Sequence, residues 1–267
     1  MAFDASKFKG STEERYMPVI LLLDFSGSMR GEKINNLYEA TVKMIKTFAT
    51  ESKKEISYKV AIITFFGHKN AMLHFPCTNE QPYVDATEDM ANNLSGFEAR
   101  GQTPLATALD MAKDLIEDPD YTKKKWYRPA VVLVSDGKPD TGWEKSFQNF
   151  ISTGRTKRCQ RLSMGIGSDA KFDMLRDFAS DDVKNFSGTD KLCFKAENAA
   201  DIAEVFELIS VSIVATAKQN PKDFPVASAP TSPSRKTDEE LSDNVPPNPP
   251  TISKRRIFYD DEDADSF

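Results

Sequence analysis

The feature that most constrains the fold is a pair of short runs that are apolar at nearly every position. One covers residues 18–23 (PVILLL) and the other covers residues 130–135 (AVVLVS). Both have the length of a strand, and a strand that lacks polar alternation is buried on both of its faces. Such strands are typical of a parallel sheet that helices cover on both sides.

Further strands are predicted at residues 58–65 and 161–166, at residues 71–75 on an edge, and at residues 192–195. The segments between them carry apolar residues three or four positions apart, which indicates helices with one buried face. These are Ile34, Leu37, Thr41, Ile45 and Phe48, then Leu105, Ala108, Leu109, Ala112 and Ile116, then Phe172, Leu175 and Phe178, and finally residues 200–217. Strands that alternate with helices predict a doubly wound, Rossmann-like α/β domain. In such domains ligands bind beyond the carboxyl ends of the strands.

Three regions are predicted along the chain: an extension at residues 1–14, the domain at residues 15–218, and a tail at residues 219–267. The tail contains eight of the 15 prolines and no periodic apolar pattern, and it carries six Lys/Arg against ten Asp/Glu. A segment of this composition cannot bury enough surface to offset its ordering entropy, so we predict that it is disordered.

Charge, cysteine content and apolar runs argue against several classes of protein. A net charge of −6 argues against a nucleic-acid partner. The three cysteines are widely spaced, which favours reduced thiols over a zinc site or a disulfide framework. The first ten residues resemble no secretory signal, and the longest apolar run, residues 19–23, is far shorter than the ~20 residues of a membrane span. We therefore expect a cytoplasmic protein without a membrane partner.

Three polar loops lie where the predicted strands and helices begin or end. Asp24, Ser26 and Ser28 follow the first apolar run at alternate positions, Thr103 opens a helix, and Asp136 follows the second apolar run. Alternate positions of an extended backbone point the same way. Hydroxyl and carboxylate oxygens are hard donors that suit Mg²⁺ or Mn²⁺. Two carboxylates only about neutralise a divalent cation, so an open coordination position attracts a carboxylate from outside.

Taken together, these loops resemble the metal-ion-dependent adhesion site of von Willebrand factor type A domains, over residues 15–218. The resemblance implies that Ser26 and Ser28 contact the metal directly and that Thr103 does so when a ligand is bound. It also implies that Asp24 and Asp136 hold coordinated waters or alternate as direct ligands. The sixth position is then filled by an Asp or Glu of a partner protein.

Within that family the chain is most similar to the bacterial tellurite-resistance (TerY-like) group. The motifs are residues 24–30 (DFSGSMR), 101–105 (GQTPL) and 135–139 (SDGKP). That group usually has two glycines before the threonine, whereas Gln102 stands second here, which puts the loop's approach to a ligand in doubt. The resemblance implies a stress-response or phage-defence system in which a Ser/Thr kinase or a metal-dependent phosphatase is the partner.

The predicted function is a non-enzymatic adaptor, and the alternative is a metal-dependent phosphotransfer or hydrolytic enzyme. A haloacid-dehalogenase-type phosphatase also begins with an aspartate after an apolar strand, but it needs a second aspartate two positions later. That position is Ser26 here. A third reading is a structural role without metal. Lys138, beside Asp136, is either solvated or able to approach an anionic partner.

The end of the tail, residues 252–267, joins a basic and aromatic block (KRRIFY) to an acidic one (DDEDAD). This order is typical of a short linear motif, although a solubilising end explains it equally well. The ~40 residues that precede it would span roughly 35 Å if flexible. One hypothesis is that a tail carboxylate occupies the metal of its own or of a neighbouring subunit.

Overall fold

The computed structural model describes residues 15–52, 56–181 and 189–219, and the strands in them form one sheet. The seven strands are β1 (Tyr16–Asp24), β2 (Ser57–Phe66), β3 (Asn70–Leu73), β4 (Val84–Asp85), β5 (Ala130–Ser135), β6 (Gln160–Ile166) and β7 (Cys193–Ala196). Six of them follow the order β3-β2-β1-β5-β6-β7, and β4 pairs with β2. The pairings are parallel except those of β3 and β4 with β2.

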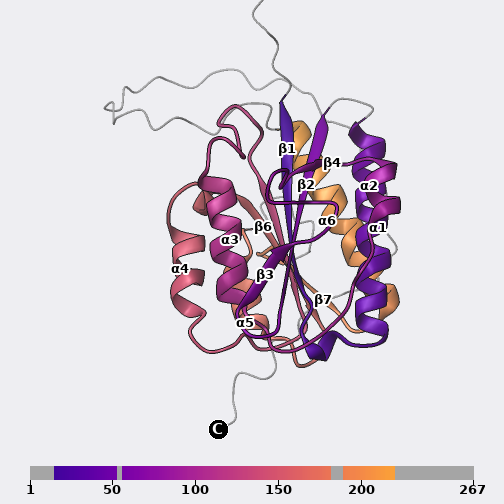
Figure 1. Ribbon diagram of the computed structural model, residues 1–267, viewed down its shortest axis with the longest axis vertical. Helices are drawn as coiled ribbons and strands as arrows, with labels where there is room; N and C mark the ends of the chain where they lie inside the picture. Colours follow the sequence, from indigo (N-terminus) through magenta and orange to yellow (C-terminus); the bar gives the residue numbers. More distant parts are fainter. Residues whose placement is uncertain (1–14, 53–55, 182–188, 220–267) are drawn as a thin grey trace, which may run out of the picture.

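Helices cover both faces of the sheet, as the alternation of strands and helices predicts (Figure 1). One layer contains α1 (Glu32–Ser52), α2 (Glu88–Asn93) and α6 (Ala199–Gln219), and the other contains α3 (Leu105–Glu117), α4 (Glu144–Ser152) and α5 (Phe172–Phe178). Two short 3₁₀ turns, Gly27–Met29 and Thr156–Arg158, complete the order. The doubly wound α/β prediction is confirmed.

The two fully apolar runs become the centre of the sheet. Residues 19–23 of β1 and residues 130–134 of β5 have no exposed surface, and the two strands pair directly. Each is screened on both faces by helices, which accounts for the lack of polar alternation. The apolar residues that predict α1, α3 and α5 are buried, except that Phe172 is half-buried.

Three short elements were not predicted. β4 has two residues and α2 has six, too few for a periodic pattern. α2 is started instead by a cap, in which the Thr87 hydroxyl accepts a hydrogen bond from the backbone N–H of Met90 at 3.0 Å. α4 buries only Phe147 and Phe150, a pair that does not repeat. All three are too short for a repeating burial pattern to predict them.

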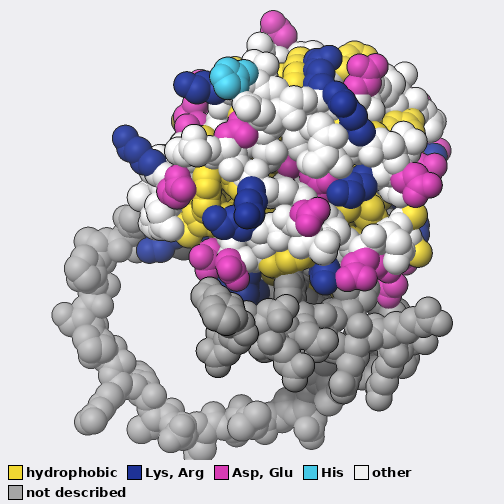
Figure 2. All heavy atoms as spheres, turned by 90° about the horizontal axis from the view of Figure 1, so that it is seen from below, with side chains coloured by type: hydrophobic (Ala, Val, Ile, Leu, Met, Phe, Trp, Pro, Cys, Tyr) yellow, Lys and Arg dark blue, Asp and Glu magenta, His cyan; other side chains and the backbone are white. Residues whose placement is uncertain are grey.

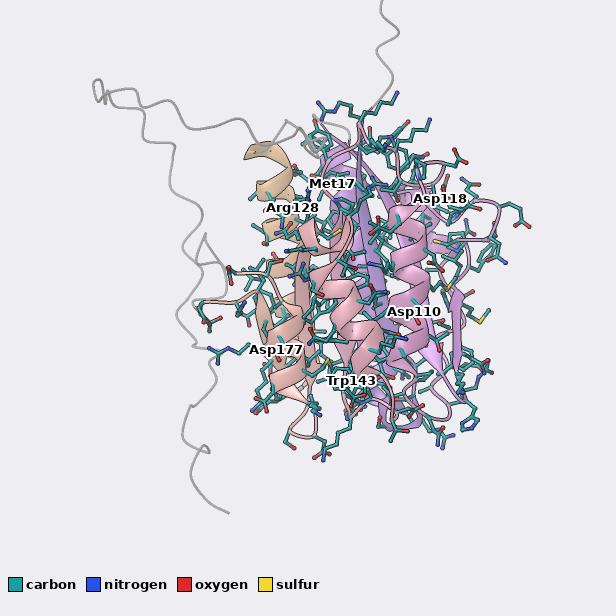
Figure 3. All side chains as sticks on the ribbon, turned by 90° about the vertical axis from the view of Figure 1, so that its left-hand side faces the viewer. Met17, Asp110, Asp118, Arg128, Trp143 and Asp177 are labelled. Atoms are coloured by element: carbon teal, nitrogen blue, oxygen red, sulfur yellow. The ribbon has the colours of Figure 1, made fainter. Side chains whose placement is uncertain are left out.

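The polar loops gather at the carboxyl ends of the parallel strands. Figure 3 shows the two ends of the domain: Met17 and Arg128, which begin or precede strands, lie at one end, and Trp143, which follows β5, lies at the other. We call the end with the strands' carboxyl termini the carboxyl edge and the opposite one the amino edge. Figure 2 looks onto the carboxyl edge, where basic and acidic side chains are interspersed.

Some predictions concern residues that the structure does not describe. The extension at residues 1–14 and the tail, apart from Gln219 at the end of α6, lie outside the described residues. Among the residues described, no helix is both long and apolar enough to cross a membrane. Cys77, Cys159 and Cys193 are buried free thiols, which agrees with the prediction for them.

Candidate metal centre

Strand register brings the first and third polar loops together. β1 and β5 are neighbours, with Leu23 paired to Val134, so Asp24 and Ser135 come next in line at the carboxyl edge. The chain continues from β1 into α1 in one helix layer, and it reaches β5 from α3 in the other. The strand order therefore reverses between β1 and β5, which is the switch point where such sheets bind ligands.

Hydrogen bonds join four of the five predicted ligands in two short chains. Asp24 accepts from the backbone N–H of Ser26 at 2.8 Å through Oδ1 and from the Ser135 hydroxyl at 2.6 Å through Oδ2. The Ser28 hydroxyl donates to Asp136 Oδ1 at 2.6 Å, and the hydroxyl oxygens of Ser26 and Ser28 are 3.0 Å apart. The end of β1 and the loop that follows it are thus linked side chain to side chain to the end of β5 and the loop after it, through Ser28 and Asp136, and through Asp24 and Ser135.

Asp24 is a buried carboxylate with neutral partners. Its side chain is at the end of β1 and has no exposed surface. Burial raises the pKa of Asp24 to about 6, against the opposing hydrogen bonds from Ser135 and Ser26, and the nearby charge of Asp136 raises it slightly further. The anionic form is therefore held at an energetic cost, which a bound cation would offset.

Thr103 lies in the adjacent loop and is held there by Asp140. The backbone N–H of Thr103 donates to Asp140 Oδ1 at 3.1 Å, and the backbone N–H of Asp140 donates to the Thr103 carbonyl at 2.9 Å. Among the described residues, no hydrogen bond joins the Thr103 hydroxyl to the other four predicted ligands. The structure thus brings four together directly and places the fifth beside them on its own support.

The loops at residues 25–28 and 100–103 are packed backbone to backbone. The Gly27 N–H donates to the Gly101 carbonyl at 2.9 Å, and the Arg100 N–H donates to the Phe25 carbonyl at 2.6 Å. Gly101 has a φ of +72°, and a Cβ there would lie 2.4 Å from Gly67 Cα. Glycine is therefore required at this position. Gln102 faces the loop after β2, which contains Gly67, and its Oε1 lies 2.6 Å from His68 Nδ1.

Sequence reasoning missed the basic residue of this site. The Lys33 ammonium contacts Asp136 Oδ2 at 2.6 Å, with a side chain that is 37% exposed against a fully buried carboxylate. Lys138, the lysine considered from the sequence, has an exposed side chain. One signal could have identified Lys33: it occupies the first turn of α1, where the helix dipole disfavours a cation. Ser135 and Asp140 were also missed as supporting residues.

The donor set fits a hard divalent cation. It offers hydroxyl and carboxylate oxygens, and the described residues contain no cluster of three or more His, Cys, Asp or Glu side chains that would hold a metal without hydroxyl ligands. Asp24, Ser26, Ser28 and Asp136 would hold the ion, with Thr103 adjacent. A site with few carboxylates and several hydroxyls suits Mg²⁺ or Mn²⁺, because these ions retain some of their waters and do not need to be enclosed by protein ligands.

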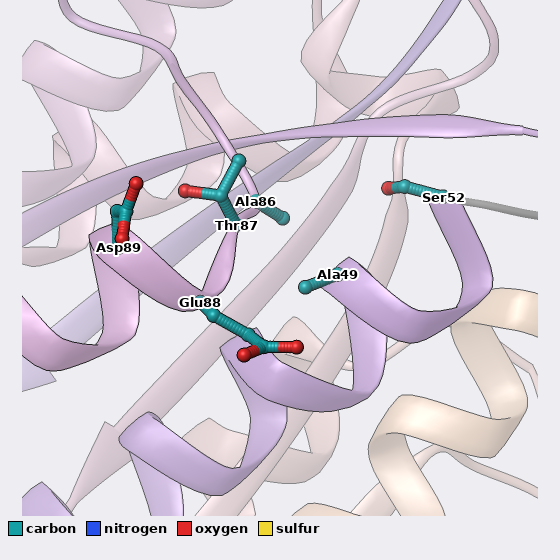
Figure 4. Close-up of a pocket in the computed structure, with 6 residues that line it drawn as sticks. All are labelled: Ala49, Ser52, Ala86, Thr87, Glu88 and Asp89. Carbon is teal, nitrogen blue, oxygen red and sulfur yellow. The ribbon is translucent and has the colours of Figure 1, made fainter.

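A hollow elsewhere in the domain belongs to a different region. It measures about 320 Å³ and lies between the end of α1 and the start of α2 (Figure 4), lined by Ala49, Ser52, Ala86, Thr87, Glu88 and Asp89. β4, which leads into α2, pairs with the first residues of β2, so this hollow is at the amino edge. It plays no part in the candidate metal centre.

Comparisons with known proteins agree with the fold. The chain is 26% identical over 171 residues to the mouse inter alpha-trypsin inhibitor heavy chain 4, and the match covers 61% of this chain and 17% of that protein. It resembles a solved von Willebrand factor type A protein from Catenulispora acidiphila (TM-score 0.56, 19% identity, 75% of this chain and 43% of that one).

A further solved structure, the mussel byssus proximal thread matrix protein 1, has zinc in its metal-ion-dependent adhesion site motif. It aligns with a TM-score of 0.54 at 15% identity, over 74% of this chain and 48% of that one. The family model of the von Willebrand factor type A domain matches residues 19–207. On this match the chain belongs to the von Willebrand factor type A domain family.

Proposed function

We propose that this chain is a non-enzymatic interaction module that binds a partner protein through a divalent cation, Mg²⁺ or Mn²⁺, at Asp24, Ser26, Ser28, Thr103 and Asp136. The observation that carries the proposal is that the Ser26 hydroxyl, the Ser28 hydroxyl and Asp136 Oδ1 form one chain of contacts at the carboxyl edge, with Asp24 Oδ1 bound to the backbone N–H of the same Ser26. The zinc-containing motif of the mussel protein supports metal binding in this family.

The charge of the site supports an acidic group on the partner. Two carboxylates line it, and Lys33 already neutralises part of the charge of Asp136. A divalent cation there would retain positive charge, which an Asp or Glu from another protein would compensate. A hydrolase or phosphotransferase would instead need a general base near the metal. Our proposal assigns both Asp24 and Asp136 to the metal as ligands, which leaves neither of them as that base.

The cellular setting is proposed on motif similarity alone. Residues 24–30, 101–105 and 135–139 resemble the bacterial TerY-like group. We therefore name a Ser/Thr kinase or a metal-dependent phosphatase of a cytoplasmic stress-response or phage-defence system as the partner class. The chain spans 17% of the length of the curated relatives it matches, so the activities of those whole proteins are not transferred to it.

The tail is proposed as a competitor for the same metal. α6 ends at the amino edge, where Lys218 pairs with Glu51 at the end of α1, whereas the metal centre is at the carboxyl edge. β1 has nine residues, so the two edges are about 30 Å apart. As a flexible chain, the ~40 residues before the acidic block would span roughly that distance. Deleting residues 250–267 should raise the affinity for an external partner, and an unchanged affinity would remove the tail from the proposal.

Calorimetry with Mg²⁺ and with Mn²⁺ tests the proposed function. The wild-type chain should bind one ion, and Asp136→Asn and Ser28→Ala should each lose most of the affinity because each removes a ligand oxygen. Asp177→Asn is the matched control, since it makes the same charge change on an exposed residue of α5 (Figure 3).

Partner capture with and without chelator completes the test. Chelation and Asp136→Asn should both abolish capture of the partner, while Asp177→Asn should leave it intact. Capture that survives both treatments would show that the partner binds elsewhere. Metal-dependent turnover of a phosphate ester by the wild-type chain, lost in Asp136→Asn, would support the enzymatic alternative instead.

A further inference from the structure

Lys33 is a cation built into the candidate metal centre. Its ammonium lies 2.6 Å from Asp136 Oδ2, while the other oxygen of the same carboxylate accepts the Ser28 hydroxyl at 2.6 Å. The lysine projects from the first turn of α1, and its Nζ would lie 3.7 Å from a Cβ at Gly167, just after β6. It is thus bracketed by loops of the carboxyl edge.

Lys33 is at a position where its charge destabilises the helix α1. A positive side chain in the first turn is repelled by the helix dipole, and α1 has Glu32 beside it as the favourable residue. The contact that compensates this is with the fully buried Asp136 carboxylate. A buried carboxylate needs a partner, so one reading is that Lys33 only stabilises the fold.

Counting charges suggests a second role. Asp24 and Asp136 contribute −2 and Lys33 contributes +1, so the three groups sum to −1. A divalent cation added to them gives +1, and one carboxylate from a partner brings the sum to zero. Without Lys33 the same count would reach zero with the metal alone.

We propose that Lys33 sets the balance of this site, lowering its affinity for the metal by itself and strengthening the binding of an acidic ligand to the bound metal. This inference rests on the proposed function, because it requires metal at Asp136. A charge within about 4–6 Å commonly changes the binding of a proton by one to three orders of magnitude. For a lysine that is partly exposed, we expect a change in metal affinity of about tenfold.

The test measures Mn²⁺ binding alone, by the paramagnetic resonance signal of the free ion. Lys33→Gln removes the charge and keeps a hydrogen-bond donor toward Asp136, so it is the main variant, and Lys33→Arg keeps the charge. Lys46→Gln is the matched control, because it removes the same charge from an exposed position of α1. We expect about tenfold tighter Mn²⁺ binding for Lys33→Gln and wild-type affinity for the other two.

Acetate serves as the carboxylate probe in a second arm. Because coupling between two ligands is reciprocal, acetate should tighten Mn²⁺ binding more in the wild type than in Lys33→Gln. Thermal unfolding of each variant in chelator reports separately on the structural role.

The outcomes separate the two claims. Equal or weaker Mn²⁺ binding by Lys33→Gln, with a folded protein and normal binding by the wild type, would overturn the role of Lys33 and leave the proposed function standing. A wild-type chain that binds no Mn²⁺ would overturn the proposed function itself. Tighter binding by Lys33→Gln together with an unchanged acetate effect would overturn the part of the proposal that concerns the acidic ligand.

Discussion

Replacing Asp24 with asparagine should stabilise the metal-free protein while abolishing binding at the proposed metal site. The geometry accommodates the change without new clashes. The asparagine carbonyl can accept from the Ser26 N–H, as Oδ1 of Asp24 does at 2.8 Å. Its amide group can donate to the Ser135 oxygen, which lies 2.6 Å from Oδ2, because a hydroxyl accepts as well as donates.

The size of the effect follows from the buried charge. Burial raises the pKa of Asp24 from 3.8 to about 6, so at neutral pH the folded protein holds a carboxylate that it disfavours relative to the unfolded chain. The difference corresponds to about 3 kcal/mol. Because the folded pKa is raised, the metal-free protein loses this stability as the pH rises from about 4 to about 6. Asparagine does not ionise and avoids the loss.

Urea denaturation in chelator measures this stability difference. The free energy of unfolding of Asp24→Asn is compared with that of the wild type from pH 4 to pH 7. Taking the difference removes the titration of all other groups. The variant should gain little at pH 4 and up to about 3 kcal/mol at pH 7, and Asp177→Asn should show no such trend. A difference that does not change with pH, or a variant less stable at pH 7, would refute the reasoning.

Three further predictions concern the same edge. Ser135→Ala removes the neutral hydroxyl that orients the Asp24 carboxylate and should weaken Mn²⁺ binding roughly tenfold, measured by calorimetry, with little change for Ser146→Ala on α4. Gly101→Ala places a Cβ 2.4 Å from Gly67 Cα and should destabilise the protein by about 1–3 kcal/mol, measured as a melting temperature lower by several degrees. Ala106→Gly is the comparison variant, because it perturbs the helix α3 and not the contact between the loops. Mn²⁺ affinity should be flat above about pH 7 and fall about tenfold for each pH unit below 6, because a proton on Asp24 competes with the metal; pH-independent affinity down to pH 5 would contradict this.

Sequence patterns predicted the architecture because its central strands are buried on both faces. Residues 18–23 and 130–135 could not be solvent-facing, and that fact alone favours a covered parallel sheet. The elements that were missed are short: β4 has two residues, α2 depends on a cap, and α4 buries only two aromatic residues. Patterns of burial are averaged over several residues, so they do not register such elements.

Some residues of the candidate site could be predicted from the sequence and others could not. Asp24, Ser26, Ser28 and Asp136 were predicted because each follows a recognisable strand, and strands of a parallel sheet end at one edge. Lys33 could not be assigned to Asp136 from the sequence, because the contact depends on how α1 leaves the loop after β1 and where the loop after β5 turns. Lys138 was nearer in sequence and is exposed instead. Proximity along the chain is a poor guide where elements meet in space.

The two carboxylates of the site are not equivalent, and the difference has a functional consequence. Asp24 accepts hydrogen bonds from a hydroxyl and a backbone amide, both neutral, whereas Asp136 faces an ammonium. A cation arriving between them therefore gains most from Asp24, whose charge is costly and uncompensated by these donors, and less from Asp136, which already has a partner. The free energy released at Asp24 both stabilises the fold and sets the metal affinity, since the two are linked. If Lys33 stays paired with Asp136, as we propose, the bound cation keeps a positive charge that a carboxylate of another protein can neutralise.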